Sequence, residues 1–599
     1  MRGKELLFYD IEVFSYDTLV VFEDIDHQIV GIYWNHRGRQ SQEEPSGFEG
    51  LPDLIKDKIL VGYNNYHYDD CILSLLLNQA TSMQYIVKAS NDRIIAGEGF
   101  SGKISPLIHS LDTMQQIDVS RPSLKQIEGN MGRSILESEI DFQIDRPLTD
   151  EERAVTVKYC AYDVESTIEV FKLRRKSYFK TKDSLLALLP EEKREKAVRW
   201  NTTTISAMIL TGGKETRWWE HPMVERLLGD RWRKVPGIPE EVWDMWEALT
   251  ESPEATMGKG KSKTIRAFGC SIVFGLGGLH GAPTKPLRAG KCRHKDVKSM
   301  YPSAICHLNA LGEATGVYDS MRQERIQIKH TDPTRAAALK LILNSVYGNF
   351  KNSYSTLCNP LASSIVCIYG MIALFSLCRE LSQAGYRILN INTDGVVYGD
   401  RPELEGKDDE ICNKWEKDFE GFSLETDEYT QWIQKDVNNY IAVSNDQITV
   451  KGGDVNKYQQ NKYFSNNNAR IIQIAMVEKL VSNTPVLSTL VHHLDDHLLW
   501  QYVLKAGGTF QGVCDSNGDL QNKVNRVFAA NEGAEYTRLY KLRKDGGKVN
   551  FPDAPDRMFL WNGDVRDLPN EDFRKMIDLD HYYTMTNEKL KGWPQDVYG

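Results

Sequence analysis

The sequence is short of the features that mark secreted, membrane and zinc-binding proteins. Ten cysteines occur in 599 residues, but no two are spaced as CxxC, so a zinc ribbon or a thioredoxin-type centre has no support. The N-terminus starts basic and then apolar, yet Asp10 interrupts the apolar run before a signal-peptide core could form. We therefore expect a cytoplasmic protein whose cysteines stay reduced.

A single apolar run is long enough to consider as a membrane span. It is "PLASSIVCIYGMIALFSLC", from Pro360 to Cys378. Serines and a glycine dilute this run, and the sequence has no second one like it. The run predicts a buried core helix, and we expect no membrane association.

The overall charge is not that of a uniformly basic nucleic-acid binder. The formal net charge is -10, which still allows local basic grooves. The 41% apolar and 26% charged content is typical of a globular protein. The length predicts about three or four domains, without internal repeats.

Patterns along the chain predict a multidomain α+β protein. The first part, to about residue 170, alternates strand-like and helical runs, which indicates an α/β domain. Residues 181–264 are charged, tryptophan-rich and mostly helical. They end in "MGKGKSKT", which we interpret as a linker because it lacks the first glycine of a phosphate-binding loop. Residues 268–453 mix strands with long helices, and the remainder is polar with basic patches.

A first group of polar residues is spread over the N-terminal domain. In "FYDIEVF", Asp10 and Glu12 are two residues apart on a predicted strand, so both leave the same face. Asp69 follows a strand and a polar turn, and Tyr159 and Asp163 are four apart on a helix. Buried carboxylates side by side are costly unless a cation compensates them.

These four carboxylates and the tyrosine suit two-metal phosphodiester hydrolysis. An all-oxygen ligand set favours hard divalent ions of the magnesium type. Asp70 is an alternative to Asp69, because the register of this motif is open. Asp112, in "HSLDTMQ", is interpreted as a structural helix cap.

A second group centres on "RILNINTDGVVYGD". Asp394 precedes a glycine between two β-favouring runs, which predicts a hairpin with the carboxylate at its tip. In "HKDVKSMYPSAI", Asp296 ends a short strand, and Pro302 turns the backbone away from the ladder. The turn exposes the amides after Asp296, which suits the oxygens of a triphosphate.

The third piece is "ALKLILNSVYGNF". Lys340, Asn344 and Tyr347 follow helical spacing, so one face carries a cation, an amide and an aromatic ring. Upstream, Arg325 and Lys329 form a second basic stripe. Taken singly, Asp394 would be a turn residue and Lys340 a solvated charge; the ordered set favours function.

"YDIE", "NNYHYD" and "YCAYD" resemble the three motifs of DnaQ-like 3′-5′ exonucleases. The resemblance covers about residues 1 to 190. It implies that Asp10, Glu12, Asp69 and Asp163 are metal ligands and that Tyr159 orients the attacking water.

"DVKSMYPS", "KLILNSVYG" and "NTDG" resemble, in the same order, the motifs of family B DNA polymerases. With the exonuclease motifs, the resemblance spans about residues 5 to 460 and is nearest to compact bacteriophage members. It implies primer-dependent DNA synthesis with proofreading, in which each active site uses two Mg²⁺ ions, with Mn²⁺ as a substitute. In the polymerase site the ions would be bound by Asp296, Asp394 and the backbone carbonyl of Val297.

The resemblance also assigns substrate contacts. Tyr301 would stack under the sugar and exclude a ribose 2′-hydroxyl. The incoming dNTP would contact Ser299, Tyr301, Arg325, Lys329, Lys340, Asn344 and Tyr347. "FGLGGLHG" resembles a glycine motif that approaches template DNA. Predicted DNA contacts are Gly277, Gly278, Tyr440, Lys451, Arg538, Lys541, Arg543 and Lys544.

Two positions depart from the family pattern. Asn392 stands where the family has an aspartate two residues before the second catalytic one, and we expect this change to be tolerated. Asn438 stands where a primer-gripping lysine is usual, so this position lacks the charge for that contact. Lys451 or a thumb lysine could replace it.

The resemblance divides the chain into six parts. These are an RNase H-like exonuclease domain (1–190), a helical connector (191–265), the palm (266–310 and 351–455), the fingers (311–350), and the thumb with the C-terminal region (456–599). In the last part Lys523, Arg526 and Lys548 join the basic residues named above as phosphate contacts. Short intervals between the polymerase motifs argue against protein priming and strand displacement.

The expected partners are primer-template DNA and dNTPs, with the protein acting as a monomer. Helicase, single-strand binding protein or clamp partners are not identified. Two alternatives remain: a nuclease whose polymerase half has decayed into a DNA-binding scaffold, and a non-catalytic replication scaffold.

Overall fold

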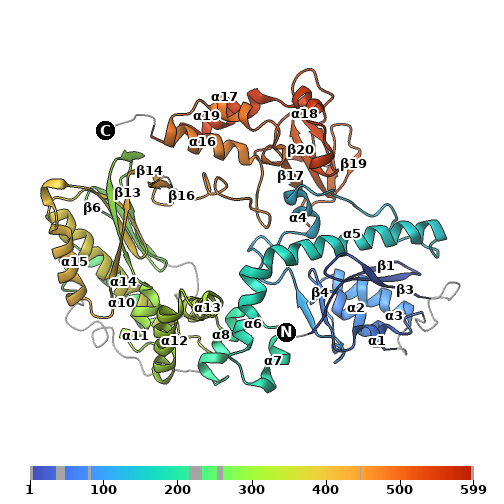
Figure 1. Cartoon of the computed structure of the whole chain (residues 1–599), viewed down its shortest axis with the longest axis horizontal. Helices are drawn as coiled ribbons and strands as arrows, with labels where there is room; N and C mark the ends of the chain where they lie inside the picture. Colours follow the sequence, from blue (N-terminus) through green and yellow to red (C-terminus); the bar gives the residue numbers. More distant parts are fainter. Residues whose placement is uncertain are drawn as a thin grey trace. The chain divides into compact units, whose positions relative to one another are not determined.

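The computed structural model describes residues 4–35, 47–78, 82–100, 102–214, 233–252, 261–445 and 447–594 (Figure 1). The chain forms two compact units. Unit 1 comprises Met1–Asn201, Lys462–Ala469 and Leu494–Asp578; unit 2 comprises Thr202–Asn461, Arg470–His493 and Leu579–Gly599. Helices and several separate sheets occur in both, which confirms the multidomain α+β class.

A five-stranded mixed sheet is the centre of the N-terminal part of unit 1. Its order is β3-β2-β1-β4-β5, with β1 to β3 antiparallel and β4 and β5 parallel to β1. The strands are β1 (Leu6–Val13), β2 (Thr18–Glu23), β3 (Ile29–Trp34), β4 (Ile59–Gly62) and β5 (Ser110–Asp112).

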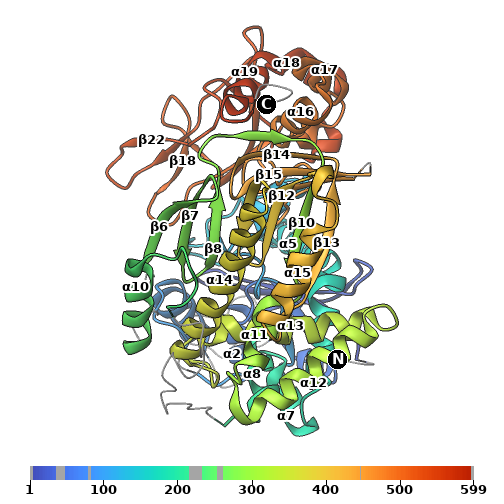
Figure 2. The ribbon, with the colours of Figure 1, turned by 90° about the vertical axis from the view of Figure 1, so that its left-hand side faces the viewer.

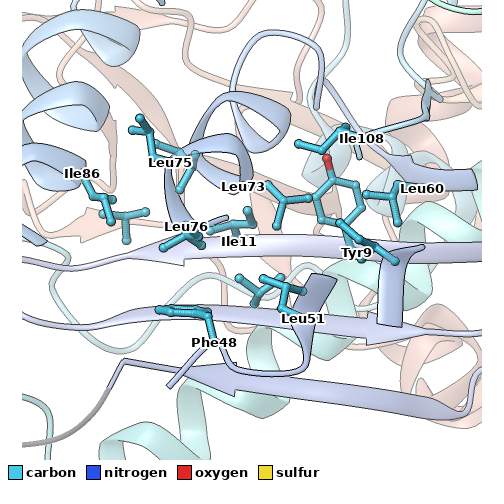
Figure 3. Packing of buried hydrophobic residues seen from close by; sticks show 14 of the residues in the cluster. Tyr9, Ile11, Phe48, Leu51, Leu60, Leu73, Leu75, Leu76, Ile86 and Ile108 are labelled. Carbon is cyan, nitrogen blue, oxygen red and sulfur yellow. The ribbon is translucent and has the colours of Figure 1, made fainter. Parts of the chain in front are cut away.

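Helices cover both faces of this sheet, because alternate residues of β1 face opposite ways. Tyr9 and Ile11 pack against Leu73 and Leu76 of α2, as Figure 3 shows. Phe8 belongs to the other face, where it packs against the long helix α5. Helices on the first face are α1 (Leu51–Ile55), α2 (Asp69–Leu76) and α3 (Met83–Lys88), and α5 is Asp150–Arg174.

Two sheets formed by residues far along the chain, together with further helices, complete unit 1. A three-stranded sheet has the order β17-β20-β23, and a four-stranded sheet has the order β19-β18-β21-β22. Helix α4 packs on β17 and β20. The elements are α4 (Leu124–Met131), α6 (Lys180–Leu186), α7 (Glu191–Ala197), β17 (Tyr502–Lys505), β18 (Gly512–Cys514), β19 (Leu520–Gln521), β20 (Val524–Ala529), β21 (Tyr540–Leu542), β22 (Lys548–Asn550), β23 (Met558–Leu560) and α18 (Asn570–Met576).

A seven-stranded antiparallel sheet dominates unit 2. Its order is β13-β10-β12-β11-β8-β7-β6, and a smaller sheet has the order β16-β15-β14-β9. The strands are β6 (Ser262–Ala267), β7 (Cys270–Gly275), β8 (Gly278–Ala282), β9 (Leu287–Ala289), β10 (Cys292–Val297), β11 (Ile388–Asn392), β12 (Gly395–Gly399), β13 (Leu424–Tyr429), β14 (Gln431–Asp436), β15 (Asn439–Ser444) and β16 (Gln447–Lys451).

Helix α14 (Pro360–Gln383) packs against the seven-stranded sheet (Figure 2). It is the one described helix that is long and apolar enough to cross a bilayer, and the apolar window that qualifies it is 100% buried in the protein. The prediction of a buried core helix is therefore confirmed. The other helices of unit 2 are α8 (Thr202–Thr211), α10 (Glu240–Glu251), α11 (Met300–His307), α12 (Thr315–Ile328), α13 (Pro333–Asn349), α15 (Lys407–Asp418), α16 (Arg470–Ser482), α17 (Val486–His492) and α19 (Leu579–Leu590).

The two units are coarser than the six predicted parts, so that division stays a prediction. Residues 494–578, which we predicted as thumb, group with unit 1, whereas 470–493 and 579–599 group with unit 2. Residues 257–260 of the predicted linker lie outside the described residues, and 262–264 belong to strand β6.

Arg526 corrects one prediction about the basic C-terminal region. Its side chain is 0% exposed, so it cannot reach a phosphate. The guanidinium donates to Gln501 Oε1 at 2.7 Å and to the carbonyls of Gly129 at 3.1 Å and Arg133 at 2.6 Å. Arg526 therefore joins α4 to the C-terminal sheets as an internal hydrogen-bond donor.

Replacing Arg526 with methionine is expected to lower the free energy of unfolding by about 3 kcal/mol, because several buried carbonyls lose their donor. Urea denaturation of the full chain measures this loss. Lys523→Met is the control, since Lys523 is exposed at the start of the same segment. Equal denaturation midpoints for the two variants would contradict the assigned role.

Candidate active sites

Carboxylates from β1 meet helix α5 in unit 1. Asp10 and Glu12 lie on the same face of β1 as Phe8, which is the face that packs on α5. Ligand atoms of Asp10, Glu12 and Cys160 lie within 4.8 Å of one another. Cys160 donates to the Asp10 carbonyl at 3.6 Å. The strand pattern therefore brings a buried carboxylate, Glu12, and a partly buried one, Asp10, beside α5.

Burial and mutual repulsion raise the pKa values of these carboxyl groups. Burial raises the pKa of Asp10 to about 7, the charge of Asp163 adds to the effect, and Lys125 opposes it. Burial and the neighbouring Asp10 also raise the pKa of Glu12 well above its ordinary value. The group holds more negative charge than its surroundings compensate.

Lys125 of α4 is the cation of this cluster, and the sequence analysis missed it. Its ammonium donates to Asp163 and lies 4.6 Å from the ring centre of Tyr159. Glu128, one turn further along α4, is fully buried and 3.6 Å from the same ammonium. Lysine-glutamate spacing of this kind is common on helices, so no local pattern distinguishes Lys125 from a surface lysine.

The environments of Asp69 and Asp70 differ. Asp70 accepts hydrogen bonds from Tyr9, from Asn65 at 3.1 Å and from Ser110 at 2.6 Å, and it pairs with Arg199. The carboxylate oxygens of Asp70 are therefore already bound by protein donors, which makes Asp70 a structural residue. The pKa of Asp69 is raised by burial and then by the charge of Asp10. This geometry favours Asp69 as the member of the cluster.

Asp112 is not a helix cap. It ends strand β5, and its Oδ1 accepts from the amides of Asn64 at 2.8 Å and Met114 at 2.7 Å. The carboxylate stabilises the turns that follow β4 and β5. Asp112 is therefore structural, as predicted, but it holds two turns and not the end of a helix.

The second group forms at the β11–β12 hairpin of unit 2. Asn392 pairs with Gly395, which leaves Thr393 and Asp394 as a two-residue loop. Thr393 has φ +57°, and its amide donates to the Leu279 carbonyl at 2.8 Å. The predicted hairpin is confirmed, and its tip is anchored to strand β8.

Strand β10 brings Asp296 to this tip. Asp296 pairs with Gly395, and the amide of Val297 donates to the Asp394 carbonyl at 2.8 Å. Burial raises the pKa of Asp296 to about 7, and Asp394 is the next largest cause. Two aspartates far apart in the sequence are therefore electrostatic neighbours at the end of one sheet.

Gly395 makes room for a histidine beside Asp296. A Cβ at residue 395 would lie 2.3 Å from His294 Nε2 and 3.0 Å from Asp296 Oδ1. His294 and Asp296 share one face of β10, with Nε2 3.9 Å from Oδ1. The glycine in "NTDG" thus has a steric cause that the sequence analysis did not detect.

Lys451 and Tyr440 lie near the Asp394 carboxylate. They are register partners in β15 and β16. Burial raises the pKa of Asp394, and Lys451 and His280 act in the opposite direction. Asn438, by contrast, donates its amide to Asp436 within a turn. Lys451 is therefore placed where it could take over from the lysine that Asn438 replaces.

Tyr301 of α11 and Tyr347 of α13 form a parallel pair next to the hairpin. Their ring centres are 4.1 Å apart and their planes differ by 3°. Tyr301 donates to the Gly277 carbonyl at 3.2 Å, and Tyr347 donates to the Leu276 carbonyl at 3.1 Å. Both tyrosines are thereby tied to the turn between β7 and β8.

The predicted triphosphate contacts lie on α12 and α13, which pack together. Lys340 and Asn344 are exposed on α13, and Lys329 is exposed at the end of α12. Arg325 donates to the Ser299 hydroxyl at 3.4 Å. Among the described residues, no hydrogen bond or ion pair joins Lys340 to Asp296 or Asp394.

The remaining predicted DNA contacts lie in unit 1, around the β21–β22 hairpin. Arg543 and Lys544 are exposed in its turn. Arg538 pairs with Asp556 at 2.6 Å, and the Lys541 ammonium lies 5.2 Å from the ring centre of Phe551. The described contacts give Arg543 and Lys544 no ion pair and no ring neighbour. These two residues therefore suit a contact with the DNA phosphate backbone best.

The donors of the unit 1 cluster fit a hard divalent cation. The carboxylates supply oxygen ligands, and their pKa values are raised first by burial and then by mutual repulsion, which a bound cation would offset. Asp296 and Asp394 offer fewer ligands, and Asp296 is half-buried whereas Asp394 is exposed. After burial, the charge of Asp394 is the next cause that raises the pKa of Asp296, and a cation bound by both would offset that repulsion.

Comparison with known proteins adds one likeness. No protein-family profile and no curated protein matches the chain. Among solved structures, the family B DNA polymerase of the hyperthermophilic archaeon Pyrobaculum calidifontis is similar, with 13% identity and a TM-score of 0.42 over 100% of this chain and 78% of that chain. A likeness at this level assigns neither family nor function, so the proposals below rest on the residues of this chain.

Gly278 is required where strand β8 approaches the hairpin tip. It has φ +119°, and a Cβ there would lie 3.1 Å from the Thr393 Cα. Gly278→Ala is expected to lower the free energy of unfolding by about 1–3 kcal/mol, because of backbone strain and this contact. Gly277→Ala is the control, since its Cβ would meet no atom nearer than 3.8 Å. Equal losses in urea denaturation would refute the explanation.

Proposed function

We propose that the protein synthesises DNA from dNTPs on a primed template and removes mismatched primer ends with a separate 3′-5′ exonuclease site. The observation that carries the proposal is the junction of β10 with the β11–β12 hairpin. It brings Asp296 and Asp394 together although they are distant in the sequence. The order of the three polymerase motifs supports the same function.

In the polymerase site, this chain's residues position substrate and charge. The primer 3′-hydroxyl attacks the α-phosphate in line, and pyrophosphate leaves. Lys340, with Arg325 and Lys329, neutralises the triphosphate. Asn344 and Tyr347 line the pocket for the new base pair, and Ser299 lies beside the turn that exposes backbone amides.

Asp296, Asp394 and the Val297 carbonyl would hold Mg²⁺, with Mn²⁺ as a substitute. When bound, such ions lower the pKa of the attacking hydroxyl and stabilise charge on the phosphates. The two aspartates would fix where the ions bind. Lys451, near Asp394, contributes positive charge on the primer side.

In the exonuclease site, Asp10, Glu12, Asp69 and Asp163 would hold the corresponding ions. Tyr159, one turn before Asp163 on α5, would orient a water toward the terminal phosphodiester. Lys125 keeps Asp163 oriented through its hydrogen bond. The mixed sheet with antiparallel β1–β3 and parallel β4 and β5 supports an RNase H-like domain.

Substituting one aspartate in each site separates the two activities. Asp394→Ala is expected to reduce primer extension by more than about a hundredfold and to leave degradation intact. Asp10→Ala is expected to do the reverse. Asp418→Ala, exposed at the end of α15, is the control. Extension that survives in Asp394→Ala would refute the two-site assignment.

The same assay separates the alternatives. A nuclease with a decayed polymerase half would degrade primers but never extend them, and a replication scaffold would bind primer-template DNA without either reaction. The pairing of Asp296 with the hairpin of Asp394 argues against decay, because a scaffold gains nothing from holding two like charges beside each other.

Tyr301→Ala is expected to raise ribonucleotide incorporation, relative to dNTPs, by about tenfold or more, since the ring would no longer oppose a 2′-hydroxyl. Single-nucleotide incorporation with matched dNTP and rNTP measures this ratio. Tyr354→Ala is the control, because Tyr354 is 99% exposed. Unchanged sugar selectivity would remove Tyr301 from the role.

A further inference from the structure

The turn between β7 and β8, residues 275–278, accepts hydrogen bonds from three helical segments. The Cys367 thiol of α14 donates to the Gly275 carbonyl at 3.6 Å. Tyr347 and Lys351 both donate to the Leu276 carbonyl, at 3.1 Å and 3.0 Å, and Tyr301 donates to the next carbonyl. Three successive carbonyls are thus held by side chains from other elements.

Lys351 is the unexplained member of this set. It lies just beyond α13 and is half-buried, and the described residues place no carboxylate within ion-pair distance of it. Its ammonium lies 5.3 Å from the ring centre of Tyr347. Partial desolvation of this ammonium costs free energy, and among the described contacts the carbonyl and the ring are the groups that offset it.

The shared acceptor couples Lys351 to Tyr347. A carbonyl oxygen has two lone pairs, so Leu276 can bind both donors at once. With the Lys351 contact in place, the carbonyl is fixed from two sides, and Tyr347 has little freedom to leave it. The parallel stacking of Tyr347 on Tyr301 then transmits this constraint to the second ring.

We propose that Lys351 is a positioning residue that fixes the Tyr301–Tyr347 pair against the 275–278 turn and thereby controls nucleotide affinity and sugar selection. The proposal deepens the proposed polymerase function and rests on it. Lys351 itself touches neither phosphate nor metal ligand in this role. Its effect passes through the Leu276 carbonyl and the two rings.

The test compares Lys351→Met, which keeps the apolar stem but removes the donor, with Lys351→Arg, which keeps a donor. Single-nucleotide incorporation on a primed template gives kcat and KM for a dNTP and the matching rNTP. Lys351→Met is expected to raise KM for the dNTP about tenfold, with kcat changed less than about threefold, and to reduce discrimination against the rNTP. Lys351→Arg is expected to restore most of both.

Lys417→Met, exposed on α15, is the control for loss of a lysine. Thermal melting accompanies every variant, because a general loss of structure lowers Tm and the apparent kcat but leaves KM unchanged. A Lys351→Met enzyme with wild-type KM and sugar discrimination overturns the inference. If the wild-type chain extends no primer at all, the proposed function itself fails, which is a separate outcome.

Discussion

The backbone pairing of β10 with the β11–β12 hairpin is the constraint on which unit 2 depends. It joins the Val297 amide to the Asp394 carbonyl and sets Asp296 opposite Gly395. Two glycines make it possible: Gly278 lets β8 approach the hairpin tip, and Gly395 leaves space for His294. Neither carboxylate could be placed by local preference alone, because each depends on a strand supplied by another part of the chain.

Both candidate sites concentrate negative charge that the fold does not neutralise. The pKa values of Asp10 and Asp296 are each raised to about 7, chiefly by burial and next by a neighbouring aspartate. Each site has a limited internal counter-charge, from Lys125 in unit 1 and from Lys451 in unit 2. Such arrangements cost stability unless a cation compensates them, and they are typical of sites that bind cations for chemistry.

The polymerase half proposed here is organised around backbone carbonyls as much as around side chains. The 275–278 turn includes Gly278, which contacts the hairpin tip, and its carbonyls accept hydrogen bonds from Tyr301 and Tyr347, the two tyrosines proposed to contact the nucleotide. One short turn therefore connects the position of Asp394 to the rings that would hold the substrate. A displacement of the turn would disturb both.

The local pattern of the sequence was sufficient for several elements. It predicted the hairpin at Asp394, the buried helix from Pro360, and the shared face of Asp10 and Glu12, because these follow from residues that are near one another in the chain. It failed where a charged residue has the same local pattern whether exposed or buried. Arg526 was therefore taken for a surface group, and Lys125, His294 and Lys351 were missed. Only tertiary packing decides which charges are enclosed and what they face, since their partners come from distant segments of the chain.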